Sequence, residues 1–250
     1  MNATELDVNL YGKHIGTLSH TGSVTDNAVL LYDDDYRDTI DATPLSLSLP
    51  LTRAEHGPDA TSAWLWGLLP DNDVTLGQIA TRARVSGRDI FGLIAYVGRD
   101  VAGAAQFLPA DHADGPGYLT PLTADELASR VEDLRRHAAT HTPPSYDNGR
   151  WSLPGAQAKL AVRYQDNAWY LSEGDEPSTH IIKPAVPGYD NFDINETAIL
   201  NTAAEIGLPA ATTTIVELAD NTHALVSQRC DRARLPDGTW TRVHQEDLCQ

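Results

Sequence analysis

The stretch WSLPGAQAKLAVRY, residues 151–164, places a Ser-Leu-Pro-Gly-Ala-Gln loop directly before an alternating strand that carries a lysine. Pro154, Gly155 and Ala156 have little or no side-chain bulk. Backbone N–H groups from Gly155 onward could therefore approach phosphate oxygens closely, as those of glycine-rich loops do. Alone this signal is weak, because a tight turn containing Pro-Gly is more often only a turn. The elements that follow the loop decide between the two interpretations.

The order of elements after the loop is that of a kinase N-lobe. Alternation and turn residues predict strands at 159–164, 168–172 and 179–183, a helix at 195–206 closed by Gly207, and a hairpin of strands at 212–218 and 223–227 around 220–221. Such a lobe has a phosphate-covering loop, a lysine on its third strand and a helix with an early glutamate. Lys183 would neutralise phosphate oxygens, and Glu196 could pair with it. The alternative for Glu196 is an acid favoured by the helix dipole.

Lysine is rare in this chain. Only Lys13, Lys159 and Lys183 occur, and two of them fall in the loop-and-strand unit. Lysine is a compact point charge suited to a polyphosphate oxygen in a narrow cleft, so this placement favours a phosphate site. Arginine-favouring codon usage and chance placement are the alternative explanations.

The first half predicts strands followed by helices. The expected strands are a hairpin over 5–18 around Gly12-Lys13, a strand at 28–32 and a sheet-edge strand at 44–51; the expected helices are 61–69, 74–85, 88–97 and 123–139. Thr123 and Glu126 form a capping box that opens the last helix. Pro-Pro and Asn-Gly within 141–150 indicate a boundary between a domain at 1–143 and one at 144–250. The expected fold class is α+β.

The totals exclude some functions. A net charge of −17 argues against unaided binding to DNA or to an anionic membrane. No signal peptide and no apolar run of about 18 residues occurs, which predicts a cytoplasmic chain. Cys230 and Cys249 lack CxxC spacing and are expected as unpaired thiols. His137 and His141 lack an adjacent Glu and are expected at the polar end of a helix, so no structural metal is predicted.

Eight ordered motifs carry a resemblance to a known family. They are PLSLSLPL (44–51), GLLPDN (67–72), GRDVAGA (98–104), SLPGAQAK (152–159), THIIKP (179–184), NETAIL (195–200), QRCDR (228–232) and HQEDLCQ (244–250). In order and spacing they resemble the HipA-type serine/threonine kinases of bacterial toxin–antitoxin systems. The resemblance spans nearly the whole chain. It implies an N-terminal β-hairpin plus helical subdomain, followed by a kinase-like N-lobe made of an antiparallel sheet with one main helix.

The resemblance also implies roles for individual residues. The ATP-binding loop would be Pro154, Gly155, Ala156, Gln157, Ala158 and Lys159; Lys183 would be the phosphate-binding lysine; Gln228, Arg229 and Cys230 would be the hinge; and Ser152 would be the serine that the family autophosphorylates to switch itself off. Gln228 and Cys230 depart from the family, which usually has an acidic residue and an aromatic there. Ala158 replaces a frequent acid. The cofactors implied are ATP and Mg²⁺.

Family members arrest growth by phosphorylating translation components such as aminoacyl-tRNA synthetases. They are restrained by a DNA-binding antitoxin of the HipB type, so DNA would be reached only through that partner and no membrane is involved. The catalytic Asp and Asn of a kinase, and its metal-binding Asp, follow the hinge. Only residues 231–250 follow it here, without an HxDxxxxN-like sequence. We therefore expect no catalytic residue and no metal ligand in this chain, an absent C-lobe, and no phosphoryl transfer by the chain alone.

Three interpretations remain open at this stage. The chain is a fragment of a full kinase, or a naturally short regulatory or antitoxin-like binding module, or a structural remnant without a nucleotide site.

Overall fold

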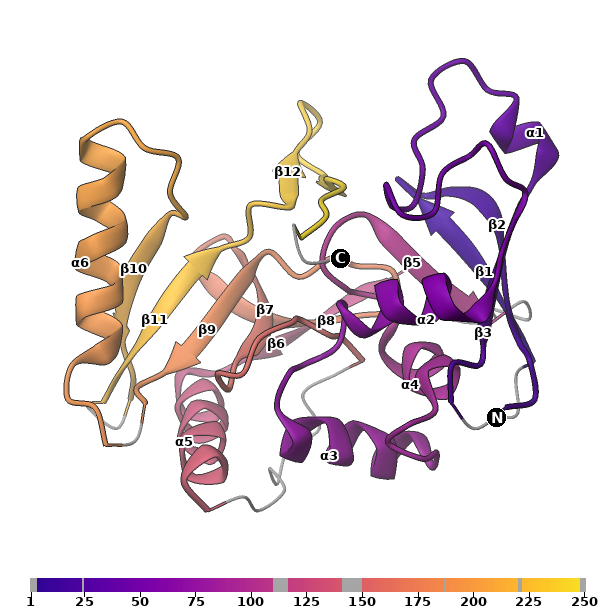
Figure 1. The fold of residues 1–250 in the computed structure, drawn as a ribbon. Helices are drawn as coiled ribbons and strands as arrows, with labels where there is room; N and C mark the ends of the chain where they lie inside the picture. The colour runs from indigo at the N-terminus through magenta and orange to yellow at the C-terminus, as the bar shows by residue number, and fades with distance from the viewer. Residues whose placement is uncertain are drawn as a thin grey trace. The chain divides into compact units, whose positions relative to one another are not determined.

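The computed structural model describes residues 4–23, 25–109, 117–140, 150–186, 188–219 and 222–247 (Figure 1). By internal contacts the chain forms two compact units. The first comprises 1–115, 150–156 and 233–250, and the second comprises 116–149 and 157–232. Strand β6 (Tyr118–Leu122) and helix α5 (Ala124–Thr140), which precede the expected boundary at residue 143/144, thus belong to the second unit.

The first unit contains a five-stranded antiparallel sheet in the order β4-β3-β2-β1-β5. Its strands are β1 (Glu5–Leu10), β2 (Lys13–His20), β3 (Ala28–Tyr32), β4 (Glu55–His56) and β5 (Ala105–Pro109). The predicted hairpin and the strand at 28–32 are confirmed. Gly16 has a φ of +154°, and a Cβ there would lie 2.1 Å from the Leu31 carbonyl oxygen, so close pairing of β2 with β3 requires glycine. Strands β4 and β5 were not predicted from the sequence.

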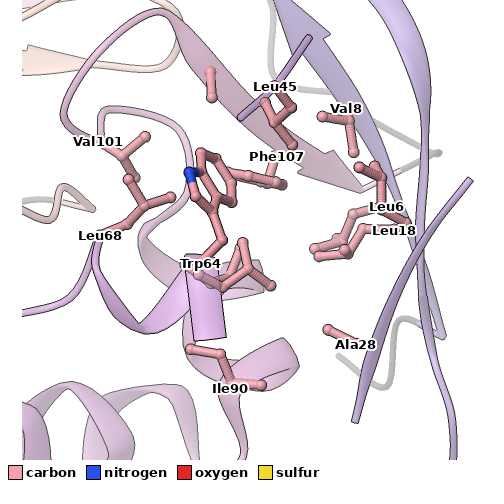
Figure 2. Close-up of a cluster of buried hydrophobic side chains, with 14 of the residues drawn as sticks. Leu6, Val8, Leu18, Ala28, Leu45, Trp64, Leu68, Ile90, Val101 and Phe107 are labelled. Carbon is pink, nitrogen blue, oxygen red and sulfur yellow. The ribbon is translucent and has the colours of Figure 1, made fainter. Parts of the chain in front are cut away.

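Helices of the first unit cover one core. They are α1 (Asp34–Arg37), α2 (Pro58–Trp66), α3 (Asp73–Ala83) and α4 (Ile90–Val97), of which the last three were predicted within a few residues. Asn72 caps α3 by accepting the Val74 N–H at 3.0 Å. Figure 2 shows the Trp64 ring of α2 beside Phe107 of β5, with ring centroids 6.2 Å apart. Aliphatic side chains of β1 and β2 also line this core: Leu6, Val8, Leu10, Ile15 and Leu18.

The predicted edge strand at 44–51 is wrong. Residues 44–51 form a turn with an isolated bridge between Ser46 and Leu49. Leu45 and Leu49 are buried, whereas Leu47 is 84% exposed. The buried Tyr32 hydroxyl accepts the Leu45 N–H and donates to the Leu49 carbonyl, both at 2.8 Å. One side chain therefore satisfies backbone groups that a neighbouring strand would otherwise pair, and the alternating leucines reflect the two ends of a turn.

The second unit contains a six-stranded antiparallel sheet in the order β10-β11-β9-β7-β8-β6. Besides β6, its strands are β7 (Leu160–Gln165), β8 (Ala168–Glu173), β9 (His180–Pro184), β10 (Thr213–Glu217) and β11 (His223–Gln228). The second helix of the unit is α6 (Phe192–Glu205). The predicted succession of three strands, a helix and two strands is confirmed, and so is the Thr123–Glu126 capping box, with a Thr123 N–H to Glu126 Oε2 distance of 2.8 Å. A short two-stranded sheet pairs β12 (Arg232–Arg234) with β13 (Trp240–Arg242).

Some sequence-based expectations fall on residues outside the described ranges. These are the boundary segment at 141–149, the turn at 220–221, His141, Cys249 and the side chain of His137. Across the ranges that are described, no helix combines the length and the apolar character needed to cross a membrane.

Candidate functional site

The lysine of the third predicted strand meets the glutamate of the following helix. Lys183 lies on β9, opposite Leu225 of the neighbouring strand β11. Its Nζ atom is 2.6 Å from Oε1 of Glu196 on α6, and the two side chains are 23% and 24% exposed. This ion pair is therefore only partly exposed to water. The geometry fits a lysine that is fixed in direction by its partner.

A second lysine stands near the first. Lys159 directly precedes β7, whose first residue, Leu160, pairs with Ile182, the residue before Lys183. The Gln157 side chain donates to the carbonyl of the last β9 residue at 3.4 Å, which ties the end of the loop to this strand.

Strand β9 carries two basic side chains, His180 and Lys183, and only the lysine is charged at neutral pH. His180 lies three residues before Lys183, and its ring packs 5.7 Å from the rings of Tyr164 and Trp169. Burial, and secondarily the positive charge of Arg163, lower the pKa of His180 to about 4. His180 is accordingly neutral at pH 7 and adds no charge beside Lys183.

The first residues of the predicted ATP loop belong to the first unit. Pro154, Gly155 and Ala156 lie there, whereas Gln157, Ala158 and Lys159 belong to the second unit. Gly155 has a φ of +104°, which a residue with a side chain rarely adopts. The loop thus needs glycine at this position for its backbone path.

Ser152, the predicted phosphorylation site, is completely buried in the first unit. Its hydroxyl donates to the Leu68 carbonyl at 2.7 Å, and its N–H donates to the Asp100 carbonyl at 3.0 Å. Leu68 lies two residues beyond the end of α2, where helix carbonyl groups carry partial negative charge. A kinase could modify this hydroxyl only after the serine has left its site.

The predicted hinge is partly committed to internal hydrogen bonds. Gln228 ends β11 and its N–H donates to the Thr212 carbonyl, while the Arg229 N–H donates to the Thr179 carbonyl, each at 2.9 Å. Gln228 and Cys230 are exposed. An adenine bound to this backbone would therefore have to use groups other than the N–H groups of Gln228 and Arg229.

The sequence reasoning missed a buried charge network next to this segment. The Arg229 guanidinium binds both carboxylate oxygens of Asp231, at 2.9 and 2.7 Å, and donates to the Ser178 hydroxyl at 2.8 Å. Arg232 donates to Asp231 Oδ2 at 2.9 Å and to the Ser178 carbonyl at 3.1 Å. The alternating charges of QRCDR were the available signal. The network fixes the chain directly after β11.

A second missed pair links helix α6 to β11. Asp193 Oδ2 lies 2.5 Å from His223 Nδ1, and the aspartate side chain is 1% exposed. Neither residue belongs to a motif with a recognisable spacing, since 30 residues separate them.

Comparison with known proteins identifies the family. The family described as the HipA N-terminal domain matches residues 6–108, and the HipA-like C-terminal domain matches residues 151–250. A Sinorhizobium fredii protein named as a kinase, Y4mE, is 33% identical over 225 residues, which cover 88% of this chain and 52% of that protein. The serine/threonine-protein kinase toxin HipA of Shewanella oneidensis is 31% identical over 248 residues, 98% of this chain and 54% of that protein.

A solved structure shares the fold. The complex of Shewanella oneidensis HipA with HipB and operator DNA matches with a TM-score of 0.78 and 30% identity, over 96% of this chain and 54% of the matched one. The class that these matches define is the HipA family. The chain is a HipA-type protein, with a mixed α/β fold built on antiparallel sheets. It spans about half the length of the relatives it matches.

Proposed function

We propose that this chain supplies the nucleotide-binding portion of a HipA-type toxin serine/threonine kinase. The observation that carries the proposal is the Lys183–Glu196 ion pair, which joins strand β9 to helix α6 at 2.6 Å. A lysine fixed by a helix glutamate is the arrangement that kinases use to hold α- and β-phosphate oxygens. The family matches support it independently.

The residues of this chain fit a polyphosphate. Lys183 on β9 supplies a point charge suited to a phosphate oxygen, and Lys159, at the end of the predicted loop, would supply a second. The second unit would act as the kinase-like N-lobe, with the segment from Gln228 to Cys230 as its hinge. The described residues hold no cluster of three His, Cys, Asp or Glu side chains around a metal position. The metal ligands and the catalytic Asp and Asn would come from the remaining half of the family's length.

Phosphorylation of Ser152 would act as an off switch. A phosphate carries close to two negative charges at neutral pH and has no proton to donate to the Leu68 carbonyl. The modified residue could not return to its buried site. The loop that follows it, 154–159, would then be displaced from the geometry that holds ATP.

The complete kinase would phosphorylate a translation component such as an aminoacyl-tRNA synthetase and arrest growth from within the cytoplasm. The partner in the matched structure is HipB, bound with operator DNA. We extend that partner to this protein as a HipB-type antitoxin, with DNA reached only through it. The net charge of −17 is consistent with this indirect route.

The proposal is tested by thermal unfolding with and without Mg-ATP. A ligand at about 100 times its Kd stabilises the folded state by about 2.7 kcal/mol, which raises Tm by several degrees. Lys183→Ala should abolish most of this increase. Lys13→Ala, which removes a lysine on β2 of the first unit, is the matched control and should keep it.

Two results would count against the proposal. An unchanged Tm of the unmodified chain in saturating Mg-ATP would contradict the proposed nucleotide site. An equal increase in Tm for Lys183→Ala and for the unmodified chain would contradict the proposed role of Lys183 in binding phosphate. Binding without phosphoryl transfer, even when the rest of the family's length is present, would favour the regulatory binding module.

A further inference from the structure

Helix α6 is attached to its sheet in an unusual way. Only two residues of 192–205 are buried, Asp193 and Thr197, and both are polar. Phe192, Ile194 and Ile199 are instead 39%, 44% and 60% exposed. Burial of large apolar side chains normally fixes where a helix lies on a sheet, so here that contribution is small. Polar contacts must therefore do most to fix the position of α6 on the sheet.

The start of α6 also lacks the usual capping contact. Asn191 at the N-cap has a φ of +55° and its side chain makes no capping hydrogen bond. The acid of the first turn, Asp193, does not face solvent but contacts His223 at the start of β11. This contact anchors the first turn of the helix to the sheet.

The strand register places this anchor next to the proposed phosphate lysine. Leu225 of β11 is directly opposite Lys183, and His223 lies two residues before Leu225, so His223 and Lys183 point to one face of the sheet. On the helix, Asp193 and Glu196 are three residues apart and so lie one turn apart. Two neighbouring carboxylates of α6 therefore meet two cationic or hydrogen-bonding side chains of adjacent strands.

We propose that Asp193 and His223 are positioning residues that hold α6 where Glu196 can pair with Lys183. The contact of 2.5 Å involves an aspartate that is 1% exposed and whose other oxygen, Oδ1, has no hydrogen-bond partner among the described residues. Without His223 the buried carboxylate of Asp193 has no partner, which is costly, and without Asp193 the contact that anchors the first turn is lost. Either loss lets the first turn of α6 move away from the sheet. Glu196, one turn further on, moves with it. The consequence for nucleotide binding rests on the function proposed above.

The three lysines of the chain provide a direct measurement. With lysine labelled at ¹³Cε, each of Lys13, Lys159 and Lys183 gives one NMR signal, assigned by Lys→Arg substitution. Glu196→Gln removes the partner charge and defines the signal of an unpaired Lys183. In Asp193→Ala and in His223→Ala, the Lys183 signal should move by most of that same difference, while the Lys13 signal stays in place.

A control separates positioning from general destabilisation. Leu218→Ala truncates a buried apolar side chain just past the end of β10, at the same hairpin end as His223, and removes no charged group. It should lower Tm and leave the Lys183 signal unchanged. The inference is overturned if Asp193→Ala and His223→Ala leave the Lys183 signal at its original position, or if Glu196→Gln does not move it. Should Asp193→Ala fail to fold, His223→Ala decides alone, because the His223 side chain is 36% exposed.

The same samples distinguish this inference from the proposed function. Failure of the unmodified chain to bind Mg-ATP would remove the nucleotide site but leave the Lys183 signal as a valid test of positioning. Normal Mg-ATP binding together with unmoved Lys183 signals would remove only the positioning role.

Discussion

Replacement of Ser152 by aspartate should expel its segment from the first unit. The serine is fully buried, and its hydroxyl donates to the Leu68 carbonyl at 2.7 Å. Aspartate brings a carboxylate to the same place and has no proton to donate. Negative charge would then face a carbonyl oxygen near the end of α2, with no cation supplied by the substitution.

The size of the effect follows from these contacts. Leaving the Leu68 carbonyl without its donor costs about 1–3 kcal/mol, and this part is shared by Ser152→Ala. An uncompensated buried charge adds about 3–5 kcal/mol in the aspartate variant only. Because about 1.4 kcal/mol is a factor of ten in an equilibrium constant, local opening should be more than 100-fold more frequent in Ser152→Asp than in Ser152→Ala.

Hydrogen exchange of a single amide reports this opening. The N–H of residue 152 donates to the Asp100 carbonyl at 3.0 Å and is present in all variants. After correction for intrinsic exchange rates, it should exchange more than 100-fold faster in Ser152→Asp than in Ser152→Ala. Ser86→Asp, at an exposed serine, is the control and should leave this amide protected. Equal protection of residue 152 in the aspartate and alanine variants would refute the reasoning.

Three other side chains give measurable effects. Tyr32→Phe should cost about 2–4 kcal/mol in urea unfolding, because two buried backbone groups of the 44–51 turn lose their partner; a cost below 1 kcal/mol would contradict this account. Asp231→Asn should cost about 3–5 kcal/mol, because two buried guanidinium groups lose their anion; chemical denaturation measures it, and an unchanged midpoint would contradict the network. His180 has a pKa of about 4 in the folded state against 6.5 unfolded, so its protonation favours unfolding and should remove about 3 kcal/mol as pH falls from 6.5 to 4. His180→Gln should lose stability less steeply in that range, and parallel pH profiles would argue against the lowered pKa.

Local pattern was sufficient for most elements of the fold. Hairpins with alternating strands and capped helices depend on residues close in sequence, which is why β3 and the capping box at Thr123 were found. The turn at 44–51 shows the limit, because its leucines alternate as in a strand while Tyr32 supplies the hydrogen bonds from 13 and 17 residues away. Strand β5 is buried on almost every residue, so no alternation marks it.

In the candidate site, too, contacts between residues close in sequence could be predicted, and contacts between distant residues could not. Lys183 and Glu196 are 13 residues apart in one strand–loop–helix unit, so the succession of elements alone suggests that they meet. Asp193 and His223 are separated by 30 residues, and Ser178 and Arg229 by 51. Whether such residues meet depends on the pairing of β11 with β9, and a slip of one residue in that register would turn His223 to the opposite face. Contacts of this kind are set by the assembled sheet, and they fix the parts that the motif residues act upon: the helix that carries Glu196 and the segment that follows β11.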